Sequence, residues 1–252
     1  MAAMTVVFVH GVPETSALWK GVRAHLDRDA LAVALPGFGT PRPAGFGATK
    51  DEYAAWLAAE LLRFGRPVDL VGHDWGAGFV LRVATAYDVP LRSWAIDVGG
   101  VFHPDYVWHE MAQVWQTPGA GEERTAATVA ARGPDRARAL QAAGVPQADA
   151  EAVAAAYDAT MGGCILDLYR SAVPNPYADW GAELRRPAPA PGLVLQPTAD
   201  PYDDPARSGE VAARLGARTQ RLPGLGHWWM LQDPAAAAGA LRAFWESVDP
   251  VP

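Results

Sequence analysis

The sequence predicts an α/β protein whose mostly parallel sheet is flanked by helices, and three observations support this fold class. Through the first hundred residues, short apolar runs alternate with helical patterns. The apolar runs are continuous rather than alternating, as in strands buried on both faces of a sheet. The pattern resumes near residue 192, beyond a long stretch without strands, so one core built from two segments of the chain is expected.

The first segment provides four strands and three helices. Residues 5–9 form a β-branched and aromatic run that enters a tight loop at His10-Gly11, and residues 31–35 form a run closed by Pro36-Gly37. Residues 51–64 place apolar side chains at helical spacing. Strands are therefore predicted at 5–9, 31–35, 68–71 and 93–98, and helices at 19–26, 51–64 and 79–86.

The rest of the chain divides into a helical insertion and the second core segment. Residues 103–187 contain Ala-rich helical patterns, predicted at 125–131, 136–143, 148–159 and 164–172, and no convincing strand. A stiff Pro-rich linker at 186–191 precedes a strand at 192–196, a helix at 209–215, a strand at 218–222 and a helix at 234–248. We expect residues 1–102 and 188–252 to form the core and residues 103–187 to form a helical lid.

The stretch from residue 68 to residue 78 is the centre of the functional hypothesis. An apolar strand ends abruptly in Gly72-His73-Asp74-Trp75-Gly76, and a helical pattern follows. This is the setting of a nucleophile elbow, a strained turn that raises one side chain above a central strand. Flanking glycines suit a turn with unusual dihedral angles and a close approach of helix to strand. The elbow residue here is Asp74, and the competing interpretation is a simple helix cap.

Two more polar residues follow predicted strands later in the chain. Asp200 follows the strand at 192–196, and His227 follows the strand at 218–222. In open α/β sheets ligands bind at the carboxyl ends of strands, where all three residues would meet. The order nucleophile, acid, histidine is that of an α/β-hydrolase triad, and the sequence contains no Gly-x-Ser-x-Gly.

These motifs together resemble the epoxide hydrolase and haloalkane dehalogenase branch of the α/β-hydrolase superfamily. The resemblance is carried by residues 10–14 (HGVPE) with Trp19, residues 35–39 (LPGFG), residues 72–76 (GHDWG), Asp200, and residues 226–228 (GHW) with Pro234. It covers nearly the whole core and implies an α/β-hydrolase fold. The chain begins at what would be the third strand of the family, so we expect a sheet of about six strands without the usual N-terminal hairpin.

A carboxylate nucleophile dictates a particular chemistry. It is ionised at neutral pH and can attack an epoxide carbon, or a saturated carbon that bears a leaving group, to form an ester. A water polarised by His227, which Asp200 orients, would then hydrolyse the ester of Asp74. The resemblance places the oxyanion donors at the backbone N–H groups of Val12 and Trp75.

The group opposite the nucleophile separates the two activities. Within the family, dehalogenases hold halide with the Trp after the nucleophile and with an Asn or a lid Trp. Here Trp75 is present, Val12 replaces the Asn, and Trp108 or Trp115 would supply the lid Trp. Epoxide hydrolases use two lid tyrosines as acids, and Tyr169 resembles one of them. At the second position the chain has Met111, with Tyr106 and Tyr157 as substitutes.

The sequence therefore favours hydrolysis of an epoxide to a diol, with haloalkane dehalogenation as the alternative. A lesser alternative is a non-catalytic receptor or a biosynthetic enzyme on the same fold. Trp108, Trp115 and Trp228 are expected as the wall of an apolar pocket. Asp97, at the end of the fourth strand, is an alternative acid for the triad. His10 and His73 are expected to be structural, and Asp203 and Asp204 to be solvated loop residues.

Composition narrows the partners. A net charge of −7 without a Lys/Arg cluster argues against nucleic acid and anionic membranes. The single cysteine, Cys164, allows no internal disulfide, and no run of about 18 apolar residues indicates a membrane span. Without a visible secretory signal, a cytoplasmic location is expected. We expect no metal and no cofactor, and a small apolar molecule as substrate. A homodimer remains open.

Overall fold

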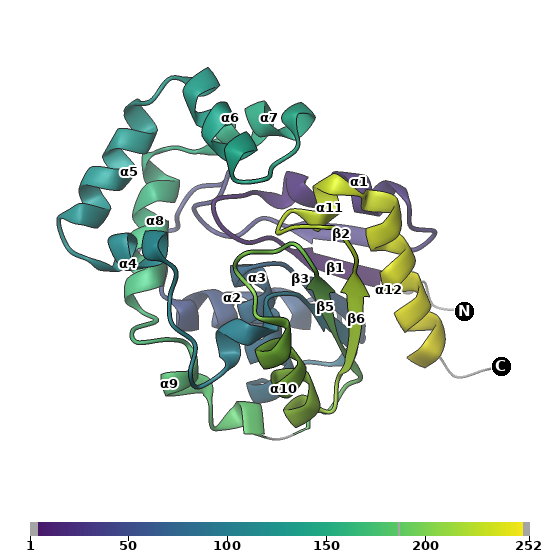
Figure 1. Ribbon diagram of the computed structural model, residues 1–252. Coiled ribbons are helices and arrows are strands. Elements are labelled where there is room, and N and C mark those ends of the chain that lie inside the picture. The colour runs from purple at the N-terminus through teal and green to yellow at the C-terminus, as the bar shows by residue number, and fades with distance from the viewer. Residues whose placement is uncertain (1–4, 186, 249–252) are drawn as a thin grey trace.

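The core is a six-stranded, all-parallel sheet, seen in a computed structural model that describes residues 5–185 and 187–248. The described strands are β1 (Thr5–Val9), β2 (Asp29–Val33), β3 (Val68–Gly72), β4 (Leu91–Ile96), β5 (Gly192–Pro197) and β6 (Arg218–Leu222). Their spatial order is β2-β1-β3-β4-β5-β6, which places β3 near the centre (Figure 1). The predicted fold class and sheet size are confirmed. The prediction that the N-terminal hairpin is missing concerns residues ahead of β1, which lie outside the described part.

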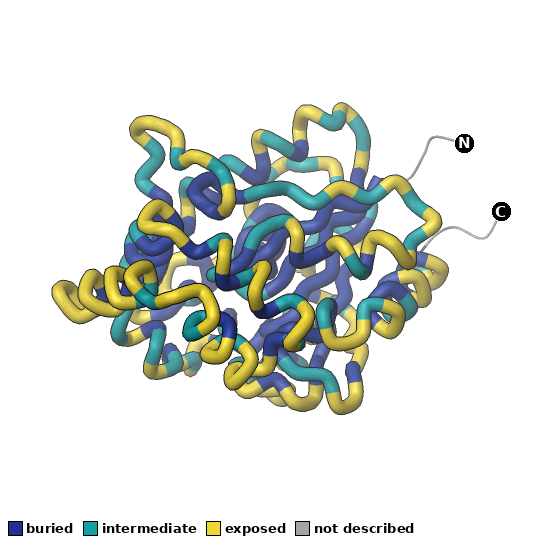
Figure 2. The backbone as a smooth tube through the Cα atoms, turned by 90° about the horizontal axis from the view of Figure 1, so that it is seen from above, coloured by how far each residue is buried: buried dark blue, intermediate teal, exposed yellow. Residues whose placement is uncertain are grey.

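Helices cover both faces of this sheet because successive strand residues point to opposite sides. Val7 and Val9 pack with the helices of one face, and Val6 and Phe8 pack with those of the other. The first face is covered by α2 (Lys50–Leu62), α3 (Trp75–Ala86) and α10 (Pro205–Leu215); the second by η1 (Ser16–Trp19), α1 (Lys20–Ala24), α11 (Trp229–Gln232) and α12 (Pro234–Val248). The four inner strands, β1, β3, β4 and β5, are largely buried between these layers, whereas the edge strands β2 and β6 are mostly half-buried or exposed (Figure 2).

Between β4 and β5 the described chain forms helices only. These are η2 (Gly99–Phe102), α4 (Glu110–Gln116), α5 (Ala120–Ala130), α6 (Gly133–Ala142), α7 (Gln147–Ala156), α8 (Ala159–Arg170), α9 (Tyr177–Trp180) and η3 (Glu183–Arg185). Figure 1 shows α4 to α8 gathered at one side of the sheet. They split into two groups. Helices α4 and α8, with α5 packed on both of them, adjoin the apolar cluster of the α2–α3 face, while α6 and α7 contribute to the cluster of the α12 face.

Several boundaries differ from the predicted ones for identifiable reasons. Strand β2 ends at Val33 rather than at residue 35, because the backbone N–H of Leu35 donates to Nε2 of His10 instead of to a neighbouring strand. Helix α3 begins at Trp75 rather than at residue 79, since Gly76 and Gly78 are needed for packing and their low helix propensity is overridden. Helices α4, α9 and α11 were not predicted. The predicted linker starts at Arg186, which lies outside the described residues.

None of the helices in the described part of the chain has the length and apolar character that crossing a bilayer requires.

Candidate active site

The turn between β3 and α3 has the geometry of the predicted elbow. Asp74 has φ 51° and ψ −122°, a conformation that L-residues rarely adopt. The flanking glycines are required sterically: a Cβ on Gly76 would lie 2.4 Å from the carbonyl oxygen of Val9, and a Cβ on Gly72 would lie 2.4 Å from the carbonyl oxygen of Gly76. The strain and the two close approaches together hold the Asp74 side chain above the end of β3, which a simple helix cap would not require.

The carboxylate of Asp74 lines the pocket and accepts a hydrogen bond from the loop after β1. The backbone N–H of Val12 donates to Oδ1 over 2.9 Å, and the side chain is 20% exposed. Trp75 is the first residue of α3, so its backbone N–H has no partner within the helix. Burial and the charge of Glu14 raise the pKa of Asp74, His227 and the Val12 N–H lower it, and the balance is a pKa of about 6. The group is ionised at neutral pH, as a nucleophile must be.

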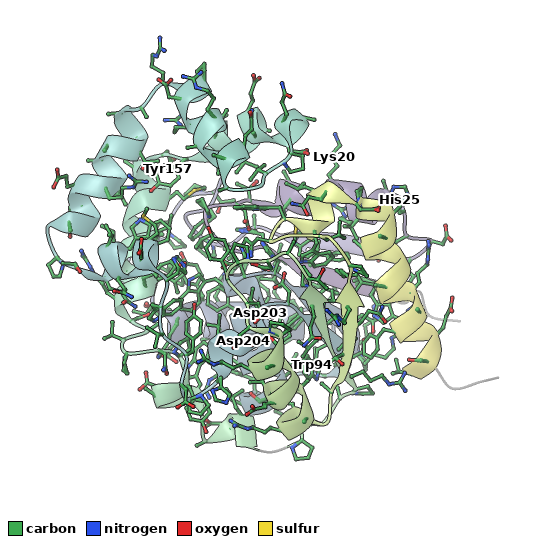
Figure 3. All side chains as sticks on the ribbon, viewed as in Figure 1. Lys20, His25, Trp94, Tyr157, Asp203 and Asp204 are labelled. Carbon is green, nitrogen blue, oxygen red and sulfur yellow. The ribbon has the colours of Figure 1, made fainter. Side chains whose placement is uncertain are left out.

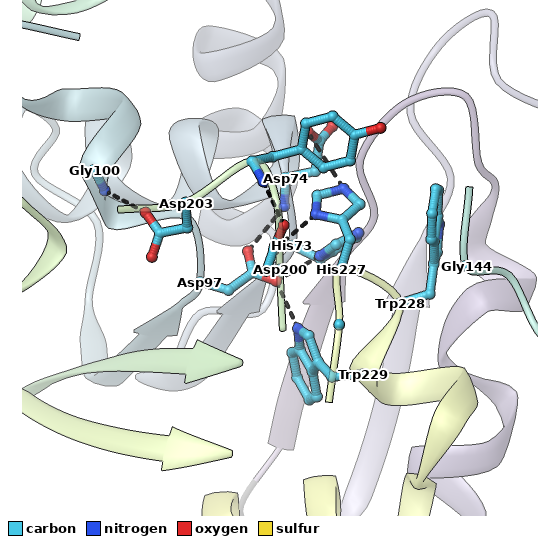
Figure 4. A network of polar contacts seen from close by, with 12 residues as sticks. His73, Asp74, Asp97, Gly100, Gly144, Asp200, Asp203, His227, Trp228 and Trp229 are labelled. Atoms are coloured by element: carbon cyan, nitrogen blue, oxygen red, sulfur yellow. Dashed lines mark hydrogen bonds and ion pairs between the residues drawn. The ribbon is translucent and has the colours of Figure 1, made fainter. Parts of the chain in front are cut away.

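His227 and Asp200 form the expected pair beside Asp74. The Nδ1–H of His227 donates to Oδ2 of Asp200 over 2.9 Å, and its Nε2 lies 3.9 Å from Oδ2 of Asp74 (Figure 4). Because Nδ1 is engaged, Nε2 is the nitrogen that can accept a proton from the pocket. Burial and the neighbouring His73 lower the pKa of His227, but Asp200 and Asp74 outweigh them and raise it above its usual value.

Asp97, the alternative acid, serves a different histidine. Its Oδ2 accepts from Nδ1 of His73 over 2.5 Å and from the indole N–H of Trp229 over 2.6 Å, and its Oδ1 accepts from the backbone N–H of Asp74 over 3.0 Å. The structure therefore gives the position beside His227 to Asp200. Asp97 instead supports the elbow from behind.

His73 is more than the packing residue that the sequence suggested. Its Nε2 lies 3.5 Å from Oε1 of Glu14, so the ring stands between two buried carboxylates, those of Asp97 and Glu14. Burial lowers the pKa of His73, but the two carboxylates raise it well above its usual value, and the ring is a cation at neutral pH. The sequence could not reveal this cluster, because residues 14, 73 and 97 meet only in the fold.

Glu14 links the His73 ring to Gly11, the residue just before the expected oxyanion donor Val12. Its Oε2 accepts from the backbone N–H of Gly11, and its Oε1 accepts from the indole N–H of Trp228 over 2.8 Å. Burial raises the pKa of Glu14, but His73 outweighs it and the pKa falls to about 2. Ligand atoms of Glu14, His73 and His227 lie within 4.8 Å of one another.

A small apolar pocket of about 110 Å³ opens above Asp74. All three tryptophans predicted for its wall are there, and so are three tyrosines; the wall includes Trp108, Trp115, Trp228, Tyr106, Tyr169 and Tyr202. Burial and the nearby charge of Asp74 raise the pKa values of both Tyr169 and Tyr106, so both hydroxyls stay protonated beside the carboxylate. Tyr157 lies outside this pocket, among the inserted helices (Figure 3), which leaves Tyr106 as the second tyrosine.

The indole N–H groups decide which tryptophans could bind an anion. The N–H of Trp108 donates to the backbone carbonyl of Ala172 over 3.0 Å, and that of Trp228 is engaged by Glu14. The buried N–H of Trp75 has no hydrogen bond of normal geometry among the described residues, although it lies near enough to the Tyr169 hydroxyl to lower its pKa. Trp75 is therefore the one of these three whose N–H is available.

One pocket residue, His109, was left unassigned by the sequence. His109, at the start of α4, lines the pocket, and its Nδ1 accepts from the backbone N–H of Ala112 over 3.2 Å. Burial lowers the pKa of His109 to about 4, so the ring is neutral and carries its proton on Nε2.

Asp203 is not the solvated loop residue that the sequence predicted: it accepts from the backbone N–H of Gly100 and from Ser208. Asp204 caps α10.

Comparisons with known proteins identify the family and the fold. Residues 6–240 match the family model described as the alpha/beta hydrolase family. The chain superposes on a loop variant of the haloalkane dehalogenase DbeA from Bradyrhizobium elkanii with a TM-score of 0.73 and 20% identity, over 98% of this chain and 91% of that one. It superposes on a thermophilic esterase from Thermogutta terrifontis with a TM-score of 0.75 and 19% identity, over 97% and 90% of the two chains. At these identities the superpositions show a shared fold.

One curated relative matches over a shorter stretch. The chain is 36% identical over 83 residues to coelenterazine h 2-monooxygenase of Renilla reniformis. The match covers 30% of this chain and 26% of the relative, so the chain spans about a quarter of that protein.

Proposed function

The chain belongs to the alpha/beta hydrolase family, and from the geometry of its site we propose that it hydrolyses epoxides to diols through a covalent ester on Asp74. The substrate is a small, largely apolar molecule, in keeping with the aromatic wall of the pocket. The residues are Asp74 as nucleophile, His227 as base, Asp200 as its orienting acid, and Tyr169 as proton donor.

In the first step an oxygen of Asp74 attacks an epoxide carbon, and the carbon–oxygen bond of the ring breaks. The oxygen that leaves becomes an alkoxide, which takes a proton from the hydroxyl of Tyr169. Burial makes the Tyr169 hydroxyl a weak acid in the resting site, but the indole N–H of Trp75 stabilises the developing phenolate. The carboxylate needs no base, so the 3.9 Å between His227 and Asp74 does not hinder this step.

In the second step a water attacks the carbonyl carbon of the ester. Nε2 of His227 takes its proton, and the Nδ1 bond to Asp200 stabilises the imidazolium. The tetrahedral oxyanion is stabilised by the backbone N–H groups of Val12 and Trp75. Esterification removes the charge of Asp74, one of the groups that raise the pKa of His227, so the base is more readily neutral when it is needed. Collapse breaks the bond between the carbonyl carbon and the ester oxygen, and the departing alkoxide takes the proton of His227 to give the diol. The new carboxyl of Asp74 returns its proton to the phenolate of Tyr169, which restores the resting site.

The observation that carries the epoxide assignment is the pair of tyrosines. Tyr106 and Tyr169 both line the small pocket, and the charge of Asp74 acts on both hydroxyls. An alkoxide needs a proton as it forms, whereas a halide needs only hydrogen-bond donors. Two protonated hydroxyls next to the nucleophile suit the alkoxide.

Haloalkane dehalogenation is the second candidate, because the buried indole N–H of Trp75 lacks a partner of normal geometry within 5–185 and 187–248 and would suit a halide. Of the two lid tryptophans that would supply a second donor, Trp108 donates its N–H to the carbonyl of Ala172, which leaves Trp115 in the pocket wall; Val12 has no side-chain donor. A passive receptor is less well supported, since it would not need the strained elbow and the pairing of Asp200 with His227.

Tyr169→Phe separates the two reactions. We expect its kcat/KM to fall by about 10²-fold or more for epoxides, the usual contribution of a general acid, and to stay near wild type for any haloalkane that is turned over. Tyr87→Phe, outside the pocket at the end of α3, is the matched control and should behave as wild type. Unchanged epoxide hydrolysis in Tyr169→Phe would remove Tyr169 from the mechanism.

A further inference from the structure

A second apolar hollow, which we call the insertion groove, lies between the two groups of inserted helices. Its walls come from α4 and α5 on one side and from α6 and α7 on the other, including Met111, Trp115, Ala127, Ala131, Ala139 and Val153. Its volume is about 390 Å³, more than that of the pocket above Asp74. A groove of this size and character is a recognised sign of a binding site.

The groove and the catalytic pocket share part of their walls. Pro13, Met111 and Trp115 line both, so the two spaces meet at these three side chains. Pro13 directly follows Val12, whose N–H contacts Asp74. The insertion groove therefore adjoins the space above Asp74.

The volumes indicate what such a molecule must look like. A pocket of about 110 Å³ is smaller than most small-molecule sites. The two spaces together fall in the range of roughly 300–1,000 Å³ that is usual for small-molecule sites. The pocket alone suits the reacting end of a substrate, and the groove suits the remainder.

Hydrogen bonds fix the walls of the insertion groove. The guanidinium of Arg136 on α6 donates through NH1 to the carbonyl oxygens of Thr128, Val129 and Ala131 at the end of α5. On the other side, Gln232 of the core donates to the carbonyl oxygen of Gly144 between α6 and α7. Arg136 thus ties α6 to the end of α5, and Gln232 ties the turn after α6 to the core, so the two walls of the groove are fixed relative to each other.

Resting on the proposed function, we infer that the substrates are elongated epoxides. The oxirane carbon lies at Asp74, and an unbranched or aryl apolar arm runs past Met111 and Trp115 into the insertion groove. Burial of each methylene of the arm strengthens binding, because apolar area is removed from water.

Substitutions on neighbouring residues of α5 test this inference. Ala127 lines the groove, whereas Ala126 is exposed and does not. For the wild type and for Ala126→Phe we expect kcat/KM to be at least about tenfold higher for 1,2-epoxyoctane than for 1,2-epoxypropane. Ala127→Phe should lower kcat/KM for 1,2-epoxyoctane about tenfold and leave that for 1,2-epoxypropane unchanged. No dependence on chain length, or an equal effect of both variants, would overturn the inference.

If Ala127→Phe fails to fold, Ala139→Phe on the opposite wall replaces it, with the exposed Ala142→Phe as its control. Calorimetric titration with 1-octanol tests the groove without any turnover. We expect binding with a negative heat-capacity change in the wild type and in Ala126→Phe, weakened about tenfold in Ala127→Phe. Octanol binding of this kind without epoxide turnover would contradict the proposed function alone; equal octanol binding in all three proteins would contradict the groove.

Discussion

His227 and His73 are both buried, both donate through Nδ1 to an aspartate, and their rings lie 4.5 Å apart, yet their second nitrogens meet different surroundings. Nε2 of His227 faces the pocket and Asp74, while Nε2 of His73 faces the carboxylate of Glu14. In the proposed mechanism the first ring exchanges protons, and the second is a fixed cation that holds two carboxylates and the elbow in place. A buried histidine paired with an aspartate is therefore catalytic in one case and structural in the other, depending on what its Nε2 faces.

The largest effect should come from the ring that faces the pocket. His227→Gln keeps a polar group near Asp200 but removes the base, so we expect steady-state turnover to fall by about 10²–10⁴-fold. Its thermal midpoint should stay close to that of the wild type. The exposed His25→Gln is the control for both measurements. A variant that retained full turnover would break the comparison, since the base would then lie elsewhere.

The buried cation should show its importance in stability. His73→Leu leaves the carboxylates of Asp97 and Glu14 buried without a counter-charge, so we expect the free energy of unfolding to fall by about 3–5 kcal/mol. Urea denaturation measures this change. The double variant His73→Leu/Glu14→Gln removes one of the stranded charges and should recover part of the loss. A His73→Leu protein as stable as the wild type would show that the ring is not a cation.

The charge of Glu14 should be visible in the pH dependence of alkylation. Asp74 attacks only when ionised, so the rate is present above its pKa of about 6 and is lost as the pH falls through that value. Glu14 raises this pKa, so Glu14→Gln should move the acid limb to lower pH, in single-turnover rates followed from pH 4.5 to 8. Glu60→Gln, on the outer surface of α2, should leave the limb in place. A limb shifted to higher pH would contradict the assignment.

A third histidine sharpens the comparison with the smallest expected change. His109 faces the pocket, but none of the residues that the structure describes gives it a carboxylate partner, and burial holds its pKa at about 4. We expect nitrogen-15 spectra to show a neutral ring with its proton on Nε2 and no titration between pH 5 and 8. His109→Gln identifies the signal. A ring that gains charge within that range would show that the pocket is wetter than its aromatic wall indicates.

The sequence was sufficient for the features that depend on local pattern. The continuous apolar runs predicted the parallel sheet, and the glycines around Asp74 predicted an elbow whose close contacts with Val9 the structure shows. Asp200 and His227 could be placed beside Asp74 because both follow strands, and parallel strands end at one edge of the sheet.

The features that depend on long-range packing could not be predicted. Glu14, His73 and Asp97 come from three different loops, and no spacing in the sequence connects them. The choice between the two candidate acids is of the same kind. Asp97 and Asp200 both follow a strand, and only the positions of the two rings decide which histidine each one binds. The insertion groove lies between helices whose relative placement the sequence does not encode locally.

The central claim is that Asp74 forms an ester that His227, and not His73, releases. Mixing His227→Gln with 1,2-epoxyoctane and weighing the intact protein and its peptides tests this most directly. We predict a stable adduct on the peptide that contains Asp74, heavier by the whole mass of the epoxide because ring opening expels nothing. Asp74→Asn should form none. The absence of an adduct on Asp74 in His227→Gln, or one equal to the substrate less hydrogen halide with haloalkanes alone, would contradict the account.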